Sequence, residues 1–544
     1  MKKHLFGITI FISLLFSTTT NAQTGIEWQA CYGSSLSENL YDACKTPDGG
    51  YIMVGDTPLD TVIGIWPTNY GKNDYGVIRI DSVGNVVWVK TYGGNSFENA
   101  LSIIKGNRPN RYYICGGTSS EGSTNYHSAL STQDAWLIAI DSNGTLLWER
   151  CYGGYSDESF NTLVQLADSN IIYGIGETSS PSNSGDVSLN YLNTITGWIC
   201  KIDANTGMLI NEKSFGGTGN DFLYYSAKLT NSSFMVHGRT SSKDHDVWNY
   251  YGLNNEGGWL LNIDTSLNIV WQKSIGSTGG GLSYDVIKTH DGGVAVLGAT
   301  TNRPGDTSCF NFYVDTLVNG TRKEEAFIIK YDSSGNELWQ QHYSAPLDRV
   351  TPNSPLVQMT DGGYAFGTEV SKWNGFALWP YNHGSVIFKT DSLGNFVSAS
   401  RYGNGGYMPL DMAQLLCTND NQLVVFSSTT PDPSISCSNQ YNGDRFWYVI
   451  RIGHQLAIED INQKQLQIKV FPNPSNGVFN IELENTKSIK QITVYNTLGQ
   501  IVKTVSTKQA IKTYKLDLSG NSKGLYFIGI EVDNSMVFKK AVLE

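Results

Sequence analysis

AWLIAIDSNGTLLWERCYGG, residues 135–154, decides the fold. It reads as an apolar strand, a tight turn at residues 141–144, and a second strand through Trp148 that ends at Gly-Gly. The same pattern occurs earlier as DYGVIRIDSVGNVVWVKTYGG, residues 74–94, and later as AFIIKYDSSGNELWQQHY, residues 326–343. The sequence therefore predicts a β-hairpin that is repeated along the chain.

The tryptophan that follows the turn sets the period of the repeat. Trp28, Trp88 and Trp148 are 60 residues apart each time, and the weaker copies are interpreted as placing Ile210 and Phe396 at the same position. A period near 60 residues that recurs this often indicates a repeat architecture.

Each period contains four predicted strands. The first follows the Gly-Gly, as in residues 160–166, the second ends in Gly-x-Thr, as in residues 51–57, and the hairpin supplies the third and fourth. Four antiparallel strands repeated radially form the blade of a β-propeller. We count seven first strands and expect an all-β, seven-bladed β-propeller. The degenerate fourth and seventh units leave this count open by one.

The two ends of the repeat region complement each other. Residues 26–33 read as a fourth strand without the first three, and the last unit ends at residues 445–453 without a fourth strand. We expect the N-terminal strand to complete the last blade, because closure satisfies edges that an open sheet leaves unpaired. The predicted propeller spans residues 23–453.

Strand alternation sorts the connections onto two faces. The first-to-second and third-to-fourth turns are short and share one face, and the long second-to-third loops share the other with the blade-to-blade connections. Insertions gathered on one face of a repeat protein usually mark the binding face. The loop residues predicted to bind a ligand are Trp66, Tyr70, Tyr126, Tyr191, Trp248, Tyr250, Tyr251, Tyr313, Trp373, Trp379 and Tyr381. The alternative is that these aromatic residues fold back into small loop cores.

Composition and charge narrow the classes of partner. Glycine occurs 57 times and charged residues make up only 16 %, which suits short strands joined by turns. The net charge is −11, although residues 462–544 carry eleven Lys and six acids, so the rest of the chain is more acidic still. An acidic body repels phosphate, and nucleic acid is therefore not an expected partner.

Residues 1–22 have the pattern of a secretory signal peptide. Two lysines precede an apolar run over residues 5–16, and small or polar residues lead to Ala22, where cleavage before Gln23 is expected. The apolar run falls short of the roughly 20 residues needed to span a bilayer. The sequence therefore predicts an exported chain that does not cross the membrane.

Eight cysteines lie between Cys31 and Cys437. Their 105 pairings leave the disulfides undetermined. Cys31 and Cys151 occupy the same repeat position, which favours two buried strand residues over a pair with each other. The sequence contains no C-x-x-C, so a zinc or redox site is not predicted.

Residues 466–544 follow a different pattern of seven short alternating strands, which predicts a small sandwich after a linker at residues 454–465. This tail resembles the C-terminal sorting domain of type IX secretion cargo in the Bacteroidota. The matching positions include Pro472, Asn473, Pro474, Gly477, Gly499, Gly524, Tyr526, Lys539 and Lys540. The resemblance implies an Ig-like domain that the outer-membrane translocon reads, and cargo that is secreted or attached to the outer cell surface. The Gly-Gly repeat is similar to that of uncharacterised propellers found in such cargo.

No pattern in the sequence clearly indicates a catalytic site. Glu98, Asp157, Glu158 and Asp221 each follow a Gly-Gly, and their recurrence at one repeat position favours a structural role over a catalytic pair. His245, between two aspartates, is the one histidine considered as a metal ligand. The Asp-x-x-Gly turns favour turn chemistry over calcium binding, and no other cofactor is predicted.

Residues 201–210 are similar to the repeats of quinone-dependent dehydrogenases, but those proteins have eight blades and often an adjacent Cys-Cys. The turn also resembles the Asp-box of sialidases without matching its spacing. Neither resemblance carries catalytic residues over to this chain.

The prediction is a binding or adhesion protein that recognises a glycan or a protein through loop aromatics. One alternative is a carbohydrate-active or quinone-type propeller enzyme with an unrecognised active site, and another is a structural surface component. An enzyme should place nonrepeating polar residues at the central mouth, whereas a binding module should display aromatic residues at the rim.

Overall fold

The computed structural model describes residues 25–58, 65–67, 70–121, 123–127, 132–167, 169–191, 194–248, 250, 257–277, 281–301, 308–310, 317–318, 321–322, 325–343, 348–372, 384–402, 411–431, 435, 445–453, 468–483, 489–496, 501–511, 513–532 and 535–544. The chain divides into two compact units, Met1–Gly453 and His454–Glu544. The predicted signal peptide and linker lie outside the described residues. Within those residues, no helix has the length and apolar character needed to cross a bilayer.

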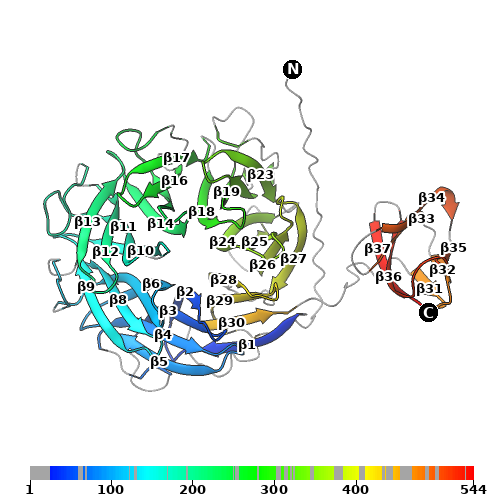
Figure 1. Cartoon of the computed structure of the whole chain (residues 1–544), viewed down its shortest axis with the longest axis horizontal. Coiled ribbons are helices and arrows are strands. Elements are labelled where there is room, and N and C mark those ends of the chain that lie inside the picture. Colours follow the sequence, from blue (N-terminus) through cyan, green and yellow to red (C-terminus); the bar gives the residue numbers. More distant parts are fainter. Residues whose placement is uncertain are drawn as a thin grey trace. The chain divides into compact units, whose positions relative to one another are not determined.

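The first unit is a ring of seven four-stranded antiparallel sheets (Figure 1), which confirms the predicted seven-bladed β-propeller. The first strand of each sheet lies innermost and packs beside the first strands of its neighbours. Blades 1 to 3 are β2 (Asn39–Lys45), β3 (Tyr51–Pro58), β4 (Asn73–Ile80), β5 (Val86–Tyr92); β6 (Glu98–Lys105), β7 (Arg111–Thr118), β8 (Asp134–Asp141), β9 (Leu146–Tyr152); and β10 (Glu158–Gln165), β11 (Ile171–Thr178), β12 (Thr196–Asp203), β13 (Leu209–Phe215).

Blades 4 to 7 repeat this order. They are β14 (Asp221–Lys228), β15 (Ser233–Thr240), β16 (Gly257–Asp264), β17 (Ile269–Ile275); β18 (Gly281–Lys288), β19 (Val294–Thr300), β22 (Glu325–Tyr331), β23 (Glu337–Tyr343); β24 (Asp348–Gln358), β25 (Tyr364–Lys372), β26 (Gly384–Thr390), β27 (Phe396–Tyr402); and β28 (Asp411–Cys417), β29 (Leu423–Thr429), β30 (Phe446–Ile452), β1 (Ile26–Tyr32). A short hairpin, β20 (Leu317–Val318) and β21 (Thr321–Arg322), lies in the loop of blade 5.

The N-terminal strand closes the ring. β1 pairs antiparallel with β30, so that Ile26 lies opposite Ile452 and Tyr32 opposite Trp447. The sheet of blade 7 therefore takes its outer strand from the start of the chain and its three inner strands from residues 411–452.

The core lies between neighbouring blades. One apolar cluster joins Leu137 and Tyr152 of blade 2 to Phe160 and Trp198 of blade 3. A third strand such as β8 is covered on both sides and buries all but its last residue. Burial on both sides explains why AWLIAI is a continuous apolar run and does not alternate.

Two connections between blades recur on the face that carries the short turns, here called the turn face. The tyrosine that ends an outer strand donates a hydrogen bond to a carbonyl in the third-to-fourth turn of the next blade, at 2.6 Å for Tyr32 to Gly84, 2.6 Å for Tyr92 to Gly144, 2.5 Å for Tyr152 to Gly207 and 2.8 Å for Tyr343 to Gly394. The outer-strand tryptophan packs on the same turn. At Gly207, where φ is +70°, an added Cβ would lie 2.9 Å from the Trp148 ring, so this position requires glycine.

Blades 3 and 4 depart from this pattern, since their outer strands end at Phe215 and Ile275. In blade 3, Phe215 has no hydroxyl, and Lys213 Nζ instead donates to the Leu267 carbonyl of the next turn at 2.9 Å. The sheet register also corrects the repeat alignment, because Asn211 and Ser398, not Ile210 and Phe396, occupy the tryptophan position.

The second unit is a sandwich of two small sheets. One contains β31 (Ile468–Phe471), β32 (Val478–Leu483) and β35 (Thr513–Asp517), and the other contains β34 (Ile501–Ile511), β33 (Ile489–Tyr495), β36 (Gly524–Val532) and β37 (Ser535–Leu543). Both contribute to one core, in which Phe479 and Leu516 of the first sheet join Ile492 and Ile528 of the second. The strand count agrees with the seven strands predicted for this tail.

The described cysteines are mostly buried thiols. Cys31 is disulfide-bonded, whereas Cys151 at the same repeat position is free and buried. The two therefore do not pair with each other.

Candidate functional site

The acids that follow the Gly-Gly connections hold the backbone on the opposite face of the propeller, here called the loop face. Glu158 is buried and accepts hydrogen bonds from Gly154 N at 2.8 Å, Thr178 Oγ1 at 2.6 Å and Ser180 N at 3.1 Å. Glu98 and Asp221 make the equivalent contacts in blades 2 and 4. We call these three the staple acids. Their contacts are the structural role that their recurrence indicates.

Asp157 also follows a Gly-Gly connection, but it is exposed. Its carboxylate accepts a hydrogen bond from Gln133 N at 3.0 Å.

In the second strand of each blade, the residue just before Thr178 or its equivalent does not share this structural role. Its side chain leaves the other side of the second strand, because successive residues of a strand point to opposite faces. From blade 1 to blade 7 this position holds Asp56, Gly117, Glu177, Arg239, Ala299, Gly367 and Ser427. We call it the variable position. It carries a charge in blades 1, 3 and 4 and a small residue in the other four, so it does not repeat around the ring.

In blades 3 and 4, a β-bulge in the inner strand supplies the partner of the variable position. The register of β10 shifts between Phe160 and Thr162, and that of β14 shifts between Leu223 and Tyr225, which leaves Asn161 and Tyr224 as the extra residues. Bulges of this kind re-aim a side chain. Here Asn161 contacts Glu177 and Tyr224 contacts Arg239.

Glu177 is the acid of this position in blade 3. Asn161 Nδ2 donates to its carboxylate and also to the Leu223 carbonyl of blade 4 at 2.9 Å. Burial raises the pKa of Glu177 to about 7 against the opposing hydrogen bond from Asn161. A carboxyl group with this pKa exchanges protons near neutral pH, as a general acid or base does. Asp56, the other acid at the variable position, lies two blades away, so the two do not form a local pair.

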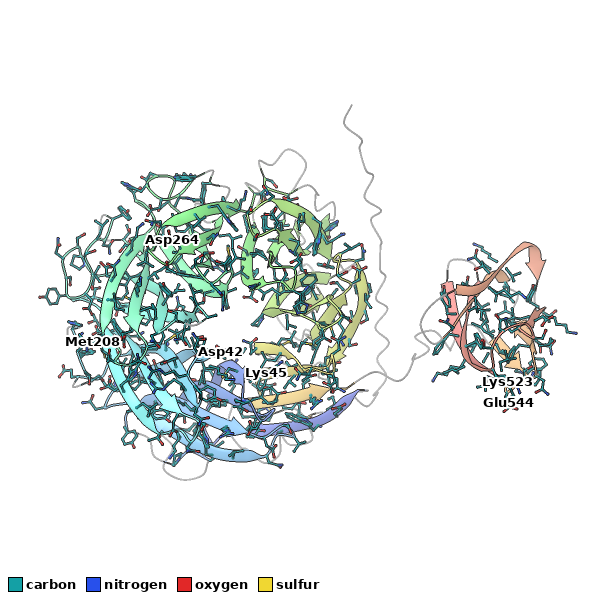
Figure 2. The ribbon with its side chains drawn as sticks, in the orientation of Figure 1. Asp42, Lys45, Met208, Asp264, Lys523 and Glu544 are labelled. Atoms are coloured by element: carbon teal, nitrogen blue, oxygen red, sulfur yellow. The ribbon has the colours of Figure 1, made fainter. Side chains whose placement is uncertain are left out.

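Polar residues also face the axis one step deeper along the inner strands. Asp42, labelled at the inner edge of the ring in Figure 2, accepts hydrogen bonds from Ser102 Oγ in blade 2 and Gln414 Nε2 in blade 7, each at 2.9 Å. Asp285 in blade 5 accepts one from Leu356 N at 2.7 Å. These contacts join neighbouring blades around the axis.

Burial raises the pKa of Asp285 to about 7, and the charge of Asp42 adds to the rise from the far side of the ring. Tyr225, between them in blade 4, has its pKa raised to about 12 by burial, although 42 % of the residue is exposed. Both facts fit a side chain that is enclosed by the inner strands and reached by solvent.

Four of the predicted ligand-binding aromatics are partly buried inside their loops. Trp66 packs edge-on against Trp447 at 5.2 Å. Tyr126 and Tyr250 pack against inter-blade cores. Tyr191 stacks on His245 with ring centres 4.7 Å apart.

Two predicted residues stand out from the loop face. Trp248 is 60 % exposed and Tyr70 is 59 % exposed. Two further exposed aromatics, Phe97 and Tyr155, lie in blade-to-blade connections that sequence reasoning assigned to this face without naming them as binding residues. Tyr251, Tyr313, Trp373, Trp379 and Tyr381 lie outside the described residues.

His245 lies at an exposed turn with φ of 53°. The flanking carboxylates have other partners, since Asp244 accepts from Thr218 N at 2.9 Å and Asp246 from Gly216 N at 3.3 Å. Among the described residues, no group of three or more His, Cys, Asp or Glu side chains could hold a metal ion.

The sorting positions of the tail gather at one edge of the sandwich. Asn473 Nδ2 donates to the Lys540 carbonyl at 2.7 Å, and Val542 N donates to Asn473 Oδ1 at 2.8 Å. The bonds before Pro472 and Pro474 are cis. The FPNP segment is therefore tied to the last strand, β37. In the adjoining connections, Gly477 and Gly524 have positive φ, and the Tyr526 hydroxyl donates to the Ser522 carbonyl at 2.5 Å. Gly499 lies outside the described residues.

Comparison with known families identifies this tail. Residues 469–544 match the secretion system C-terminal sorting domain. The tail is thus a type IX secretion sorting domain, which implies secretion to the cell surface or beyond and an interaction with the secretion machinery. No relative of the chain was found among curated proteins.

Several solved structures are similar to the chain at low identity. Hydrazine synthase of Kuenenia stuttgartiensis is 11 % identical with a TM-score of 0.39, over 76 % of this chain and 95 % of that one. The acylaminoacyl peptidase of Pyrococcus horikoshii is 10 % identical with a TM-score of 0.38, over 83 % of this chain and 59 % of that one. A protein of unknown function from Dyadobacter fermentans is 8 % identical with a TM-score of 0.37, over 78 % and 98 %. At these values the likenesses carry no argument about activity or ligand.

Proposed function

We propose that this exported propeller binds a glycan through aromatic side chains displayed on its loop face. The observation that carries the proposal is the presentation of Trp248, whose side chain is exposed while its backbone is fixed. Sugar rings stack on such aromatic faces, and a fixed backbone lowers the entropy lost on binding.

The loop of blade 4 holds Trp248 in place. Trp248 N donates to Gln272 Oε1 at 3.2 Å, and Gln272 Nε2 donates back to the Asp246 carbonyl at 2.6 Å. The preceding residue, Val247, is buried in the core between blades 3 and 4. The exposed indole therefore directly follows a segment that is attached to the sheet through Gln272 and to the core through Val247.

Phe97 and Tyr155 are held in a similar way. Tyr155 is 68 % exposed, and its backbone N donates to Ser184 Oγ at 2.9 Å. Phe97 is 48 % exposed and pairs through its backbone with Asn73, while Lys72 Nζ lies 4.6 Å from its ring centre. The exposed aromatic side chains are spread over the first four blades, and this spread suits an extended ligand such as an oligosaccharide.

The route to the ligand follows from the tail. We propose that residues 1–22 act as a signal peptide cleaved before Gln23, and that residues 466–544 contact the outer-membrane translocon. Export by this route would place the loop-face aromatics outside the cell, where glycans are abundant.

The test is a glycan-array screen of the full-length exported chain, with and without calcium, followed by Kd measurements on the best ligand. We expect Trp248→Ala and Tyr155→Ala each to weaken binding about tenfold, which corresponds to roughly 1.4 kcal/mol of stacking energy. Met208→Ala is the matched control, because Met208 is an exposed apolar residue in a short turn on the turn face, labelled at the outer edge of the ring in Figure 2.

Equal affinity in all three variants would contradict the proposal. No binding to any glycan would also overturn it, and would favour protein adhesion or a structural surface component.

A further inference from the structure

Arg239, at the variable position of blade 4, is a cation without a carboxylate partner among the described residues. Its Nε is buried and donates no hydrogen bond to any acceptor in the protein. Its guanidinium lies 5.7 Å from the centre of the Tyr224 ring. Two other arginines of the propeller have carboxylate partners, Arg79 with Asp48 at 2.7 Å and Arg451 with Asp420 at 2.8 Å.

An uncompensated guanidinium is unexpected in a chain with a net charge of −11. A partly buried charge costs free energy unless it is paired. The Tyr224 ring offsets part of that cost through a cation–π contact. The remaining N–H groups of Arg239 are available to an anion from outside the chain.

A second unpartnered nitrogen lies beside the first. His237 is two residues from Arg239 on β15, so both side chains leave the same side of the strand. His237 is fully buried, and its Nε2 lies 2.6 Å from Ser283 Oγ of blade 5. Its Nδ1 has no hydrogen-bond partner in the protein. Burial lowers the pKa of His237 to about 3, and the charge of Arg239 adds to this effect, so the imidazole is neutral at pH 7.

Solvent reaches this part of the inner wall. Tyr225 lies opposite His237 in the sheet, with ring centres 6.2 Å apart, and is 42 % exposed. The Arg239 site, defined as Arg239, His237, Tyr224, Tyr225 and Ser283, lies where the inner strands of blades 4 and 5 meet.

We propose that the Arg239 site binds the carboxylate of an acidic sugar of the uronic acid type. This inference rests on the proposed glycan-binding function and names the class of sugar. The planar fork of a guanidinium matches both oxygens of a carboxylate. A single cation balances a monoanion such as a carboxylate, whereas a phosphate monoester would carry more charge than Arg239 alone can neutralise. The exposed Tyr225 ring offers a face to the pyranose ring.

The other blades cannot repeat the site. The variable position holds Glu177 in blade 3 and Ala299 in blade 5, so the recognition of a carboxylate is confined to blade 4. The site therefore takes one acidic sugar residue per propeller.

The test is isothermal titration of the full-length exported chain with an oligogalacturonate and with a neutral galacto-oligosaccharide of equal length. We expect one oligogalacturonate per chain and weaker binding at high salt, because exposed charge interactions are screened. Arg239→Gln should weaken oligogalacturonate binding at least about tenfold. Arg108→Gln removes an exposed arginine from the turn face and should change the Kd less than about twofold.

Thermal unfolding separates this role from a structural one. Arg239→Gln should not lower the Tm of the free protein, because it removes a charge that the protein leaves uncompensated. A marked fall in Tm would show that the protein itself satisfies Arg239, and would overturn the inference. Arg239→Lys keeps the charge without the fork and should weaken binding while the fold is retained.

The outcomes separate the inference from the function on which it rests. Glycan binding that depends on Trp248 and is unaffected by Arg239→Gln would overturn the inference and leave the proposed function standing. Uronate binding that depends on Arg239 but not on Trp248 or Tyr155 would support the inference and count against the aromatic display. Equal affinity for the acidic and neutral oligosaccharides would overturn the inference.

Discussion

The two faces of the propeller use the same repeat in different ways. On the turn face, a tyrosine hydroxyl and a tryptophan ring join one blade to the next in blade after blade. On the loop face, the staple acids repeat while the adjacent variable position changes from acid to glycine to arginine. Thr178 and Glu177 are neighbours in one strand, yet the first serves the repeat and the second does not. The repeated contacts hold the ring together, and the variation beside them is where recognition can arise.

The largest effect on the free energy of unfolding is expected from removal of a staple acid. Glu158→Ala leaves Gly154 N and Thr178 Oγ1 without their acceptor inside the protein, while Ser180 N keeps only Thr178 Oγ1 at 3.1 Å. Unsatisfied buried donors and the cavity should lower the free energy of unfolding by about 3 kcal/mol or more. Equilibrium denaturation in urea measures this change.

Asp157→Ala is the control for that measurement. Asp157 is the preceding residue, is exposed, and accepts a single hydrogen bond. Its replacement should cost less than about 1 kcal/mol. Similar losses for the two variants would break the distinction between staple acids and ordinary surface acids.

A smaller effect on the free energy of unfolding is expected when a change of pH alters the charge of Asp285 on an inner strand. The pKa of Asp285 is about 7 in the folded chain, well above its value in the unfolded chain, because the carboxyl is buried. The folded state therefore binds more protons between about pH 4 and pH 7, so this group's contribution to stability is fully present only below about pH 4 and is lost progressively as pH rises through 7. Between pH 5 and pH 8 the loss should be about 3 kcal/mol.

Asp285→Asn removes this dependence while its side-chain oxygen can still accept from Leu356 N. Denaturation at pH 5 and pH 8 should show that the free energy of unfolding of the variant, relative to the parent, rises by about 3 kcal/mol between the two values. A parallel shift at both values would mean that the titration of Asp285 does not limit stability.

Loss of one turn-face hydrogen bond should have a still smaller effect. Tyr152→Phe removes the bond to the Gly207 carbonyl and keeps the ring in the core. Such a bond contributes roughly 1 kcal/mol net. Blade 3 already carries Phe215 at the equivalent place, so thermal unfolding should show a modest fall in Tm and no loss of fold.

The smallest effect on stability is expected where the loop face is most exposed. Trp248→Ala should change the free energy of unfolding by less than about 0.5 kcal/mol, as surface substitutions usually do. A larger loss would show that the indole packs on its loop and is not held ready for a ligand. Circular dichroism during thermal unfolding is sufficient to detect the difference.

Much of the fold follows from local chemistry that the sequence displays. The Asp-x-x-Gly turns, the Gly-Gly connections and the apolar third strands occur in each clear copy, so the blades and their number could be predicted. The tryptophan alignment failed in blade 3 because its third-to-fourth turn is one residue longer, with Gly207 four residues after Asp203 where Gly84 is three after Asp81.

The candidate site was less accessible to sequence reasoning. Aromatic residues in the long loops do not reveal which side of the loop they occupy, and Trp66 is drawn onto Trp447 while Trp248 is left outside. Phe97 and Tyr155 lie in short connections that carry no length signal. Arg239 becomes notable only when the sheet register places it beside Tyr224 and among residues that offer it no carboxylate. The variable position is visible in the sequence of the first five copies as the residue between Gly and Thr.

The pairing of β1 with β30 makes the folding of the ring depend on nearly the whole propeller sequence. Ile26 cannot find Ile452 until all seven repeats have been synthesised, and contacts between residues so distant in sequence form slowly. A truncated or damaged chain leaves an open strand edge in the seventh sheet, which proteases and aggregating partners can engage. Ring closure therefore requires an intact propeller sequence. It cannot occur until Ile452 has been synthesised, which is shortly before the sorting domain is made.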